Sequence, residues 1–401
     1  MEIRTIDAGE IGAWRHTMSK VFAFDPAADP HGDERLLALL DLSRAFACVD
    51  RGEIVATAAA FDFRLSLPGG SVPMSGLTMV TVMPTHRRRG ILRGLIAHHL
   101  EAAKHHGDPL SGLWASEATI YGRFGYGIAT ESESLTLNGV EVQARGRALD
   151  EATWVSGDAV HEVCSVYQAA AAERPGMFSR DASWWKFRRF SERPDQRGAA
   201  SPRAYVVFRR GEVLTGYLAF RQRLSFEQGV AAGSVEIDEL VTLDAQAELS
   251  AWHYVTQVDL FPKVTWWNAP VDSAVTWLAT DRRRVSRLRR DTMWLRVDDV
   301  ARVLAARSYG LEGTLRIGVD GETFALEVAA REGVGGPARC VRVDGEAEVA
   351  MDRAALGSIL LGGFAPSMLA RVGRVQGTAT AVARADQMFA SAVAPWCPEV
   401  F

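Results

Sequence analysis

Three consecutive arginines, Arg87 to Arg89, precede Gly90 and a segment of helical periodicity in this 401-residue chain. The apolar residues 77–82 are expected to form a strand that ends at Pro84, directly before the arginines. Guanidinium groups bind phosphate oxygens bidentately, the first N–H groups of a helix have no partner inside it, and glycine lets the backbone approach a ligand closely. Strand, cationic turn and helix are together suited to hold a pyrophosphate. The alternative is a basic surface turn that binds nothing.

Two tyrosines lie in the string ASEATIYGRFGYG at 115–127 and could act as proton donors. A phenol with a pKa of about 10 stays protonated at neutral pH and can give its proton to a departing group. The residue types alone do not separate Tyr121 from Tyr126, and both could instead be core aromatics with a wet edge. No acidic residue occurs in 76–82, so a proton acceptor has to come from elsewhere in the chain.

These residues need a sheet and a helix to position them. The pattern predicts a hairpin of Phe46–Val49 and Ile54–Leu67, followed by the strand at 77–82. Helical spacing follows Gly90, and Leu113–Ala115 is a further short strand. Strands followed by a helix and another strand predict a mixed α/β domain.

A second copy of this pattern lies 159 residues downstream. One ungapped offset relates Arg51-Gly52-Glu53 to Arg210-Gly211-Glu212, Ala60-Phe61 to Ala219-Phe220, and Arg64-Leu65-Ser66 to Arg223-Leu224-Ser225. A constant offset indicates a duplicated fold. The copy has Ala245-Gln246-Ala247-Glu248-Leu249 where the first has His86–Gly90, so it lacks both the cations and the glycine and is not expected to bind a pyrophosphate.

The last segment has a different pattern. Short β-like runs separated by glycine-rich turns are expected at Leu315–Val319, Phe324–Val328, Cys340–Val343 and Ala347–Met351. Helices are expected at about 353–361 and 384–393. We therefore expect three domains, at 1–150, 151–290 and 291–401.

Composition narrows the class of protein. The chain is 48% hydrophobic and 23% charged with a net charge of −4, which is typical of a soluble globular protein and argues against broad nucleic-acid binding. Its four cysteines, Cys48, Cys164, Cys340 and Cys397, form no CxxC pair, so no metal site is expected. No signal peptide or membrane span is predicted, and we expect a cytoplasmic protein with no membrane partner.

The strings THRRRGILR at 85–93 and ASEATIYGRFGYG at 115–127 resemble the enhanced intracellular survival (Eis) aminoglycoside acetyltransferases, a branch of the GNAT acyltransferases. Leu92 stands where most GNAT members have Gly or Ala, and the Eis branch is similar in having Leu there. The resemblance implies an α+β chain of two tandem GNAT-like domains followed by a sterol-carrier-like domain. It also implies acetyl-coenzyme A as the co-substrate, no metal, and a homo-hexamer built from trimers.

The resemblance gives roles to particular residues. It favours Tyr121 over Tyr126 as the general acid, and it implies that the terminal carboxylate of Phe401 is the base. A frayed terminus is the alternative, although the tail from Ala394 is apolar and proline-stiffened and so could dock. The expected acetyl-coenzyme A contacts are Val80, Thr81, Val82, Arg87, Arg88, Arg89, Gly90, Ile91, Leu92 and Arg93, with Ser116 and Glu117 added by resemblance. Local similarity to the family's substrate pocket adds Phe24, Asp25, Asp291 and Glu399.

These observations predict an N-acetyltransferase that acts on primary amines of polycationic small molecules, aminoglycosides among them. Direct attack in a ternary complex is expected because no cysteine lies in the two motif strings. One alternative shares the co-substrate but acetylates protein lysines or another amine metabolite. The other is a binding module whose C-terminal domain carries a lipid or a partner, against which the intact Arg87–Gly90 turn speaks.

Overall fold

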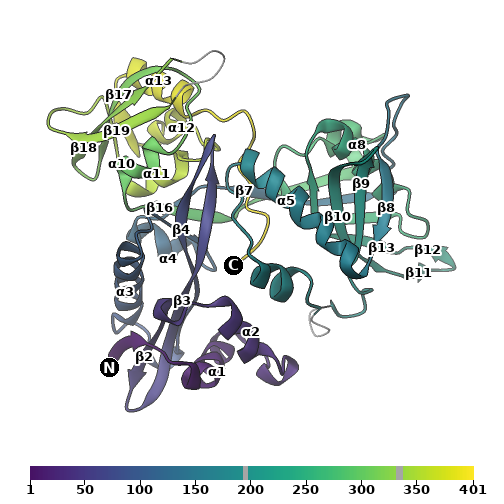
Figure 1. Cartoon of the computed structure of the whole chain (residues 1–401), viewed down its shortest axis with the longest axis horizontal. Coiled ribbons are helices and arrows are strands. Elements are labelled where there is room, and N and C mark those ends of the chain that lie inside the picture. Colours follow the sequence, from purple (N-terminus) through teal and green to yellow (C-terminus); the bar gives the residue numbers. More distant parts are fainter. Residues whose placement is uncertain (193–196, 331–336) are drawn as a thin grey trace.

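The computed structural model describes residues 1–192, 197–330 and 337–401, which form three lobes (Figure 1). The first lobe is built on a seven-stranded sheet of order β1-β2-β3-β4-β5-β16-β6. Its strands are β1 (Glu2–Thr5), β2 (Ala45–Asp50), β3 (Glu53–Leu67), β4 (Gly70–Val82), β5 (Leu110–Trp114), β6 (Gly127–Ile128) and β16 (Met293–Val297). The predicted hairpin is confirmed as β2–β3, and the strand expected at 77–82 is the end of the longer β4.

Helices cover both faces of this sheet. Its helices are α1 (Ile11–Phe22), α2 (Gly32–Leu39), α3 (Ile91–His105) and the short α4 (Ala118–Tyr121). Both α1 and α3 contact β3 and β4, but their buried side chains belong to two separate hydrophobic clusters. The α1 face carries Trp14 and Phe63, and the α3 face carries Leu95 and Leu113. Each face of the sheet therefore has a core of its own.

The second lobe repeats the arrangement, as the 159-residue offset predicts. Its sheet has the order β15-β7-β14-β13-β10-β9-β8. The strands are β7 (Glu131–Asn138), β8 (Glu151–Val155), β9 (Ala204–Arg210), β10 (Val213–Arg223), β13 (Ser234–Thr242), β14 (Lys263–Pro270) and β15 (Val285–Asp291), with a small β11 (Phe226–Glu227) and β12 (Val230–Ala231) ribbon beside them. The helices are α5 (Glu162–Glu173), α6 (Ala182–Trp184), α8 (Ala245–Thr256) and α9 (Val275–Leu278).

The second copy enters its helix without a cationic turn. Asp244 is the N-cap of α8, and its carboxylate accepts a hydrogen bond from the backbone N–H of Ala247 at 2.9 Å. The residues aligned with His86–Gly90 lie inside α8 rather than in a loop. An acidic cap occupies the helix N-terminus and repels a phosphate there, which agrees with the predicted loss of the pyrophosphate site.

The two sheets interlock, and here the structure differs from the expected boundary at residue 150. The chain leaves the first sheet after β6 and enters the second at β7, and it returns between β15 and β16. The two crossings lie side by side, with the hydroxyls of Thr130 and Thr292 2.7 Å apart. Strand pairing with β15, whose residues lie 148 to 160 positions further along the chain, determines where β7 lies.

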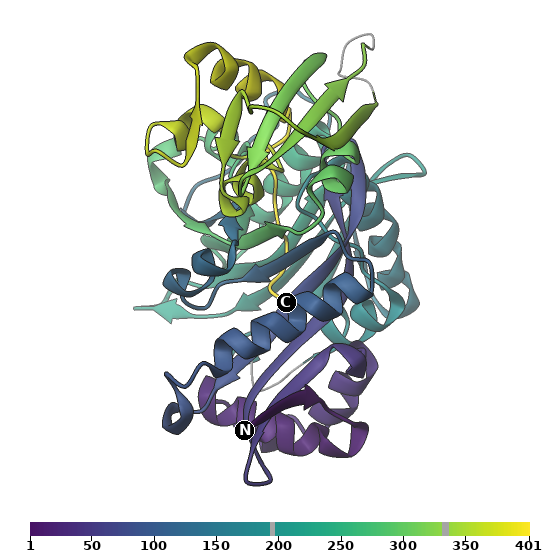
Figure 2. The same ribbon diagram turned by 90° about the vertical axis from the view of Figure 1, so that its left-hand side faces the viewer.

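The third lobe has a five-stranded sheet of order β19-β18-β17-β20-β21. Its elements are α10 (Val300–Ala305), β17 (Gly313–Val319), β18 (Glu322–Val328), β19 (Ala338–Val343), β20 (Val349–Met351), α11 (Arg353–Ile359), α12 (Pro366–Ala370), β21 (Val375–Gly377) and α13 (Ala379–Phe389). The four predicted strands are present, while α13 begins and ends before the predicted 384–393. From this lobe the C-terminal tail runs to the centre of the molecule (Figures 1 and 2). No helix in the described part of the chain is long and apolar enough to cross a membrane.

Candidate active site

Strands β4 and β5 separate at the centre of the first sheet. Their parallel pairing extends only from Met74–Leu77 on β4 to Leu110–Leu113 on β5, whereas β4 continues to Val82. A β-bulge at Met79, whose φ is +53°, bends β4 at this point. The hydroxyl of Thr57 donates to the carbonyl oxygen of Met79 at 2.7 Å and holds the bulge. Bulges re-aim strands next to active sites, and this one leaves the β4 edge beyond Leu77 without a partner on β5.

The arginine turn follows this edge directly. Arg88 and Gly90 both have positive φ, +63° and +81°, and Gly90 is the N-cap residue of α3. A Cβ at Gly90 would meet nothing within 4 Å, so the turn requires glycine for its conformation and not for space. Arg87, Arg88 and Arg93 are exposed and form no ion pair with any described residue. The helix N-terminus and its unpaired cations remain available to an anion.

A cavity of about 1170 Å³ lies between this turn, the end of α1 and α4. Eleven of the predicted co-substrate contacts line it: Val80, Thr81, Val82, Arg87, Arg88, Gly90, Ile91, Leu92, Arg93, Ser116 and Glu117. Arg89 is exposed and is not among the described lining residues. Sequence reasoning missed Val21, Phe22, His86, Ile120, Arg123 and Phe124, which also line the cavity.

The two candidate tyrosines differ in their surroundings. Tyr121 ends α4 and lines the cavity, where burial raises its pKa and a hydrogen bond from Ser116 partly opposes that shift. Tyr126 is not among the described lining residues, and its hydroxyl lies 2.7 Å from that of Ser111. Ser111 in turn lies 2.7 Å from Nε2 of His99, whose pKa burial lowers to about 3. Tyr126 therefore belongs to a buried polar chain, whereas Tyr121 faces the cavity.

The C-terminal tail is docked, as its apolar and proline-rich sequence allows. Trp396 donates from its indole to the Asn268 carbonyl at 3.0 Å, and the Asn268 amide donates to the Cys397 carbonyl at 3.0 Å. Trp114, the last residue of β5, donates its indole N–H to the sulfur of Cys397 at 3.2 Å. The ring of Phe401 packs on Phe63 with centroids 5.1 Å apart. The described tail thus lies against both GNAT-like lobes and is not frayed.

Phe401 and Tyr121 lie on opposite faces of the first sheet. Phe401 belongs to the α1-side core with Phe63, and Tyr121 to the α3-side core with Leu77. A Cβ at Gly76 would lie 2.6 Å from the Phe63 ring and 3.3 Å from the Phe401 ring. Successive residues of a strand point to opposite faces of the sheet. Gly76 therefore faces the Phe401 side and Leu77 faces the Tyr121 side, at the position where β4 and β5 separate.

The tail is anchored by a buried charge cluster, which we define as Arg180, Arg188, Arg189, Glu239 and Glu399. The guanidinium of Arg180, fully buried, lies 2.6 Å from Glu239 and 3.0 Å from Glu399. Arg189 lies 3.1 Å from Glu239, and Arg188 lies 3.6 Å from Glu399. Burial opposes ionisation of Glu399, but Arg180, Arg189 and Arg188 outweigh it and keep its pKa below the usual range. Trp184 also donates its indole N–H to Glu399 at 2.9 Å.

The predicted substrate-binding residues are placed differently from one another. Glu399 is committed to the charge cluster and is not a free carboxylate for a cationic substrate. Asp25 is exposed and accepts a hydrogen bond from Ala27 N at 2.9 Å as the cap of a short helix. Asp291 accepts the indole N–H of Trp294 at 2.7 Å. Phe24 packs on the α1-side core, the same cluster that holds the ring of Phe401.

The family models agree with the three lobes. A model described as an acetyltransferase (GNAT) domain matches residues 2–129, a second GNAT model matches 176–303, and a sterol carrier protein domain model matches 300–398. The predicted order of two tandem GNAT-like domains followed by a sterol-carrier-like domain is confirmed. No group of three or more His, Cys, Asp or Glu side chains placed to hold a metal ion occurs among the described residues.

Full-length relatives share this architecture. An uncharacterized N-acetyltransferase of Streptomyces coelicolor is 35% identical over 100% of both chains. The N-acetyltransferase Eis of Mycobacterium tuberculosis is 32% identical over 85% of this chain and 84% of its own. The crystal structure of Eis1 from Mycobacterium abscessus has a TM-score of 0.84 at 26% identity, with both chains covered completely. The chain therefore belongs to the Eis family of GNAT N-acetyltransferases and is an acetyltransferase of that type.

Proposed function

We propose that this N-acetyltransferase moves the acetyl group of acetyl-coenzyme A to primary amines of polycationic small molecules, aminoglycosides among them. GNAT acetyltransferases use acetyl-coenzyme A, and the residues present suit it. The observation that carries the proposal is the unpaired β4 edge that leads directly into the cationic turn. Val80 and Val82 offer main-chain groups to the pantetheine arm, and Arg88 and Arg93 with the α3 N-terminus bind the pyrophosphate.

Tyr121 is proposed as the general acid. The acceptor nitrogen forms a bond to the thioester carbon, the carbon–sulfur bond breaks, and the leaving thiolate takes the phenolic proton. Two observations support this role: Tyr121 lines the cavity, and its raised pKa keeps the proton on the phenol across the neutral range. The buried Tyr126 has its hydroxyl already committed to Ser111.

The terminal carboxylate of Phe401 is proposed as the base that takes a proton from the substrate's ammonium group, so that the neutral amine can attack the thioester. The docked tail supports this role because it brings the chain end to the α1-side face, beside the gap between β4 and β5. A free α-carboxylate has a pKa of about 3.5, so this group type is ionised at neutral pH and attracts a cationic amine. The acetyl donor on the α3 side and the amine on the tail side then form a ternary complex without an acyl-enzyme.

The substrate class can be tested with an acetyl-transfer assay over aminoglycosides, polyamines, small monoamines and basic peptides. We expect aminoglycosides to be acetylated with the highest kcat/KM. Acetyl transfer to lysine peptides alone would show that proteins, not small amines, are the substrates, without contradicting the proposed acetyl-coenzyme A site. No turnover of acetyl-coenzyme A with any amine would refute the proposal. A variant extended by a few residues after Phe401 should bind acetyl-coenzyme A normally but lose turnover.

We also propose the homo-hexamer that the family resemblance implies, in the cytoplasm and with no nucleic-acid partner. Light scattering coupled to gel filtration measures the mass directly. A mass of six chains of 43.7 kDa would support the hexamer, and a concentration-independent monomer would refute it.

A further inference from the structure

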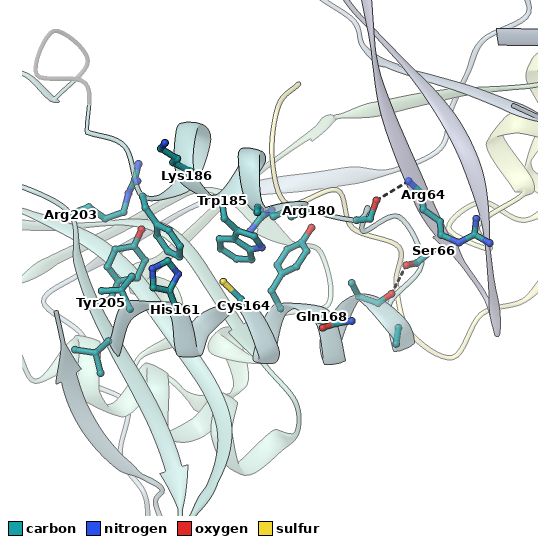
Figure 3. A pocket seen from close by; sticks show the side chains of 18 of the residues that line it. Arg64, Ser66, His161, Cys164, Gln168, Arg180, Trp185, Lys186, Arg203 and Tyr205 are labelled. Atoms are coloured by element: carbon teal, nitrogen blue, oxygen red, sulfur yellow. Dashed lines mark hydrogen bonds between the residues drawn. The ribbon is translucent and has the colours of Figure 1, made fainter. Parts of the chain in front are cut away.

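A second cavity, of about 1330 Å³, lies between the two GNAT-like lobes and shares no described lining residue with the cavity at the arginine turn. One wall is α5, which contributes Cys164 and Gln168, together with its N-cap residue His161 (Figure 3). Trp185 and Arg180 face α5 across the space, Arg64 and Ser66 lie at one end, and Arg203 and Tyr205 lie at the other. Neither the proposed donor site nor the tail-side face accounts for this volume.

The cavity is built rigidly. Residues 176–179 pair with β3 of the first lobe: Ser66 N donates to Met177 O at 2.8 Å, and Ser179 N donates to Arg64 O at 2.8 Å. The hydroxyl of Ser66 donates to the carbonyl of Ala171 on α5, and that of Ser179 accepts from Arg64 N. Ligand sites are typically such preformed spaces at domain junctions, and the volume exceeds what a drug-sized molecule needs.

The lining is aromatic in the middle and basic at both ends. Tyr167, Trp185, Phe190 and Tyr205 supply flat apolar surface, and His161 stands edge-on to Phe190 at 4.9 Å. The basic lining residues are Arg64, His161, Arg180, Lys186 and Arg203. Arg180 is paired with Glu239 and Glu399, and Arg203 with Asp238 at 2.6 Å, whereas Arg64 and Lys186 form no ion pair with a described residue and carry the uncompensated positive charge. None of the described lining side chains is acidic. Charge complementarity therefore favours an anion with an apolar body.

Arg180 has a buried hydrogen-bond donor without an acceptor among the described residues. Arg180 lies flat on Tyr167, with its guanidinium carbon 3.7 Å from the ring centroid, and its Nε has no hydrogen-bond partner among the described residues. The side chain is completely buried, so an unmade hydrogen bond there is unfavourable. At the rim, Arg64 is exposed and forms no ion pair with any described residue. An anionic group of a ligand would neutralise Arg64 at the rim.

We propose that this cavity binds an amphipathic organic anion: an aryl or acyl body that lies against Trp185 and Tyr167 and carries a carboxylate, sulfonate or phosphate group. The apolar body removes aromatic surface from water, and the anionic group lies toward the basic ends. The site is separate from the acetyl donor and from the amine substrate, whose charge has the opposite sign.

The test uses the full-length protein and 8-anilinonaphthalene-1-sulfonate, an aromatic anion that fluoresces when it leaves water. Cys164 reports on the position of the probe, since it lines the cavity and is half-buried, whereas Cys48, Cys340 and Cys397 are buried. The rate of alkylation of Cys164 by iodoacetamide is measured by peptide mapping, with and without the probe. We expect one probe per chain, and at least about fivefold slower alkylation when it is bound.

Variants then locate the anion. Arg64→Glu should weaken probe binding by about fivefold at low salt, because it reverses a cation at the rim. Arg283→Glu makes the same charge change at an exposed site on the second lobe and should leave binding unchanged. Saturating acetyl-coenzyme A should not displace the probe. A fatty acid and an aryl phosphate, used as competitors, distinguish acyl carboxylates from phosphorylated ligands.

Three results would overturn the proposal. Displacement of the probe by acetyl-coenzyme A would place it at the arginine turn. Unchanged alkylation of Cys164 would place it elsewhere. Slow alkylation without any probe, which becomes faster on dilution, would mean that a second copy of the chain covers the cavity.

Discussion

Replacing Glu399 by glutamine tests how the C-terminal tail is held. The substitution keeps the shape of the side chain but removes a buried negative charge that lies 3.0 Å from Arg180 and within 4 Å of Arg188 and Arg189. Removing one partner of a buried ion pair typically destabilises by 3–5 kcal/mol, since the remaining charge has lost its counter-ion. Arg180 still contacts Glu239 at 2.6 Å, so we take the lower end, about 3 kcal/mol.

This free energy acts on the docking of the tail. Each 1.4 kcal/mol changes an equilibrium constant about tenfold. A loss of about 3 kcal/mol in docking therefore raises the population of the undocked tail about 100-fold. A carboxypeptidase that accepts C-terminal aromatic residues releases Phe401 only from the undocked state. When docking is faster than cleavage, the release rate follows that population, so we expect release about 100-fold faster than in the wild type. Mass spectrometry of the shortened chain measures it.

Glu227→Gln is the matched control, because Glu227 is exposed on the ribbon of the second lobe and forms no ion pair with a described residue. Its release rate should equal that of the wild type. In Glu399→Gln, kcat should also fall while the Kd for acetyl-coenzyme A stays unchanged, since the arginine turn lies on the other face of the sheet. Release within about threefold of the wild type would show that the charge cluster does not hold the tail.

Tyr121→Phe should lower kcat about 100-fold with little change in acetyl-coenzyme A affinity, whereas Tyr126→Phe should leave kcat near normal and lower stability by about 1 kcal/mol; equal loss of kcat in both would contradict the assignment of the acid. Gly76→Ala places a Cβ 2.6 Å from the Phe63 ring and should destabilise by about 1–3 kcal/mol while displacing Phe401, which calorimetry and a kcat measurement would detect. His99 has a folded-state pKa of about 3 because it is buried, against about 6.5 when unfolded, so the unfolded chain takes up a proton first and stability falls as the pH drops from about 6.5 toward 3. His99→Gln should flatten that part of the stability curve for the first lobe, and an unchanged curve would exclude His99 as a cause.

The parts of the fold that depend on local pattern could be predicted from the sequence. Two apolar runs on either side of the Asp50-Arg51-Gly52 turn predict the β2–β3 hairpin, and Gly90 after three arginines predicts the start of α3. The repeat was visible because its second copy retains the same turn, Arg210-Gly211-Glu212, between β9 and β10. Similarity to a known family supplied the sterol-carrier-like lobe and the docked tail, which local pattern alone leaves open.

The parts that depend on distant pairing could not be predicted. Nothing near Glu131 indicates that β7 leaves the first lobe and lies between β14 and β15 of the second. The bulge at Met79 is another case, since methionine rarely has positive φ and only the Thr57 hydroxyl, 22 residues away, explains it. Local similarity to the family placed Glu399 among the substrate carboxylates. Nothing near it in the sequence indicates its ion pairs with Arg180 and Arg189, which lie more than 200 positions upstream.

The second GNAT-like lobe lacks the cationic turn of the first, yet it contributes to the proposed site of the first. Its Asp244 cap repels phosphate, while Arg180 and Arg189, which precede its central strands, bind Glu399 of the tail. The strand β13 supplies Glu239. Burial alone would raise the pKa of Glu239, but Arg180 and Arg189 outweigh this effect and lower it to about 2, which keeps the cluster charged. A charge cluster of this kind fixes position more than it adds stability, because desolvation offsets most of the attraction between its members. The duplicated lobe therefore holds the chain terminus at the α1-side face of the first sheet, where we propose that the acceptor amine enters.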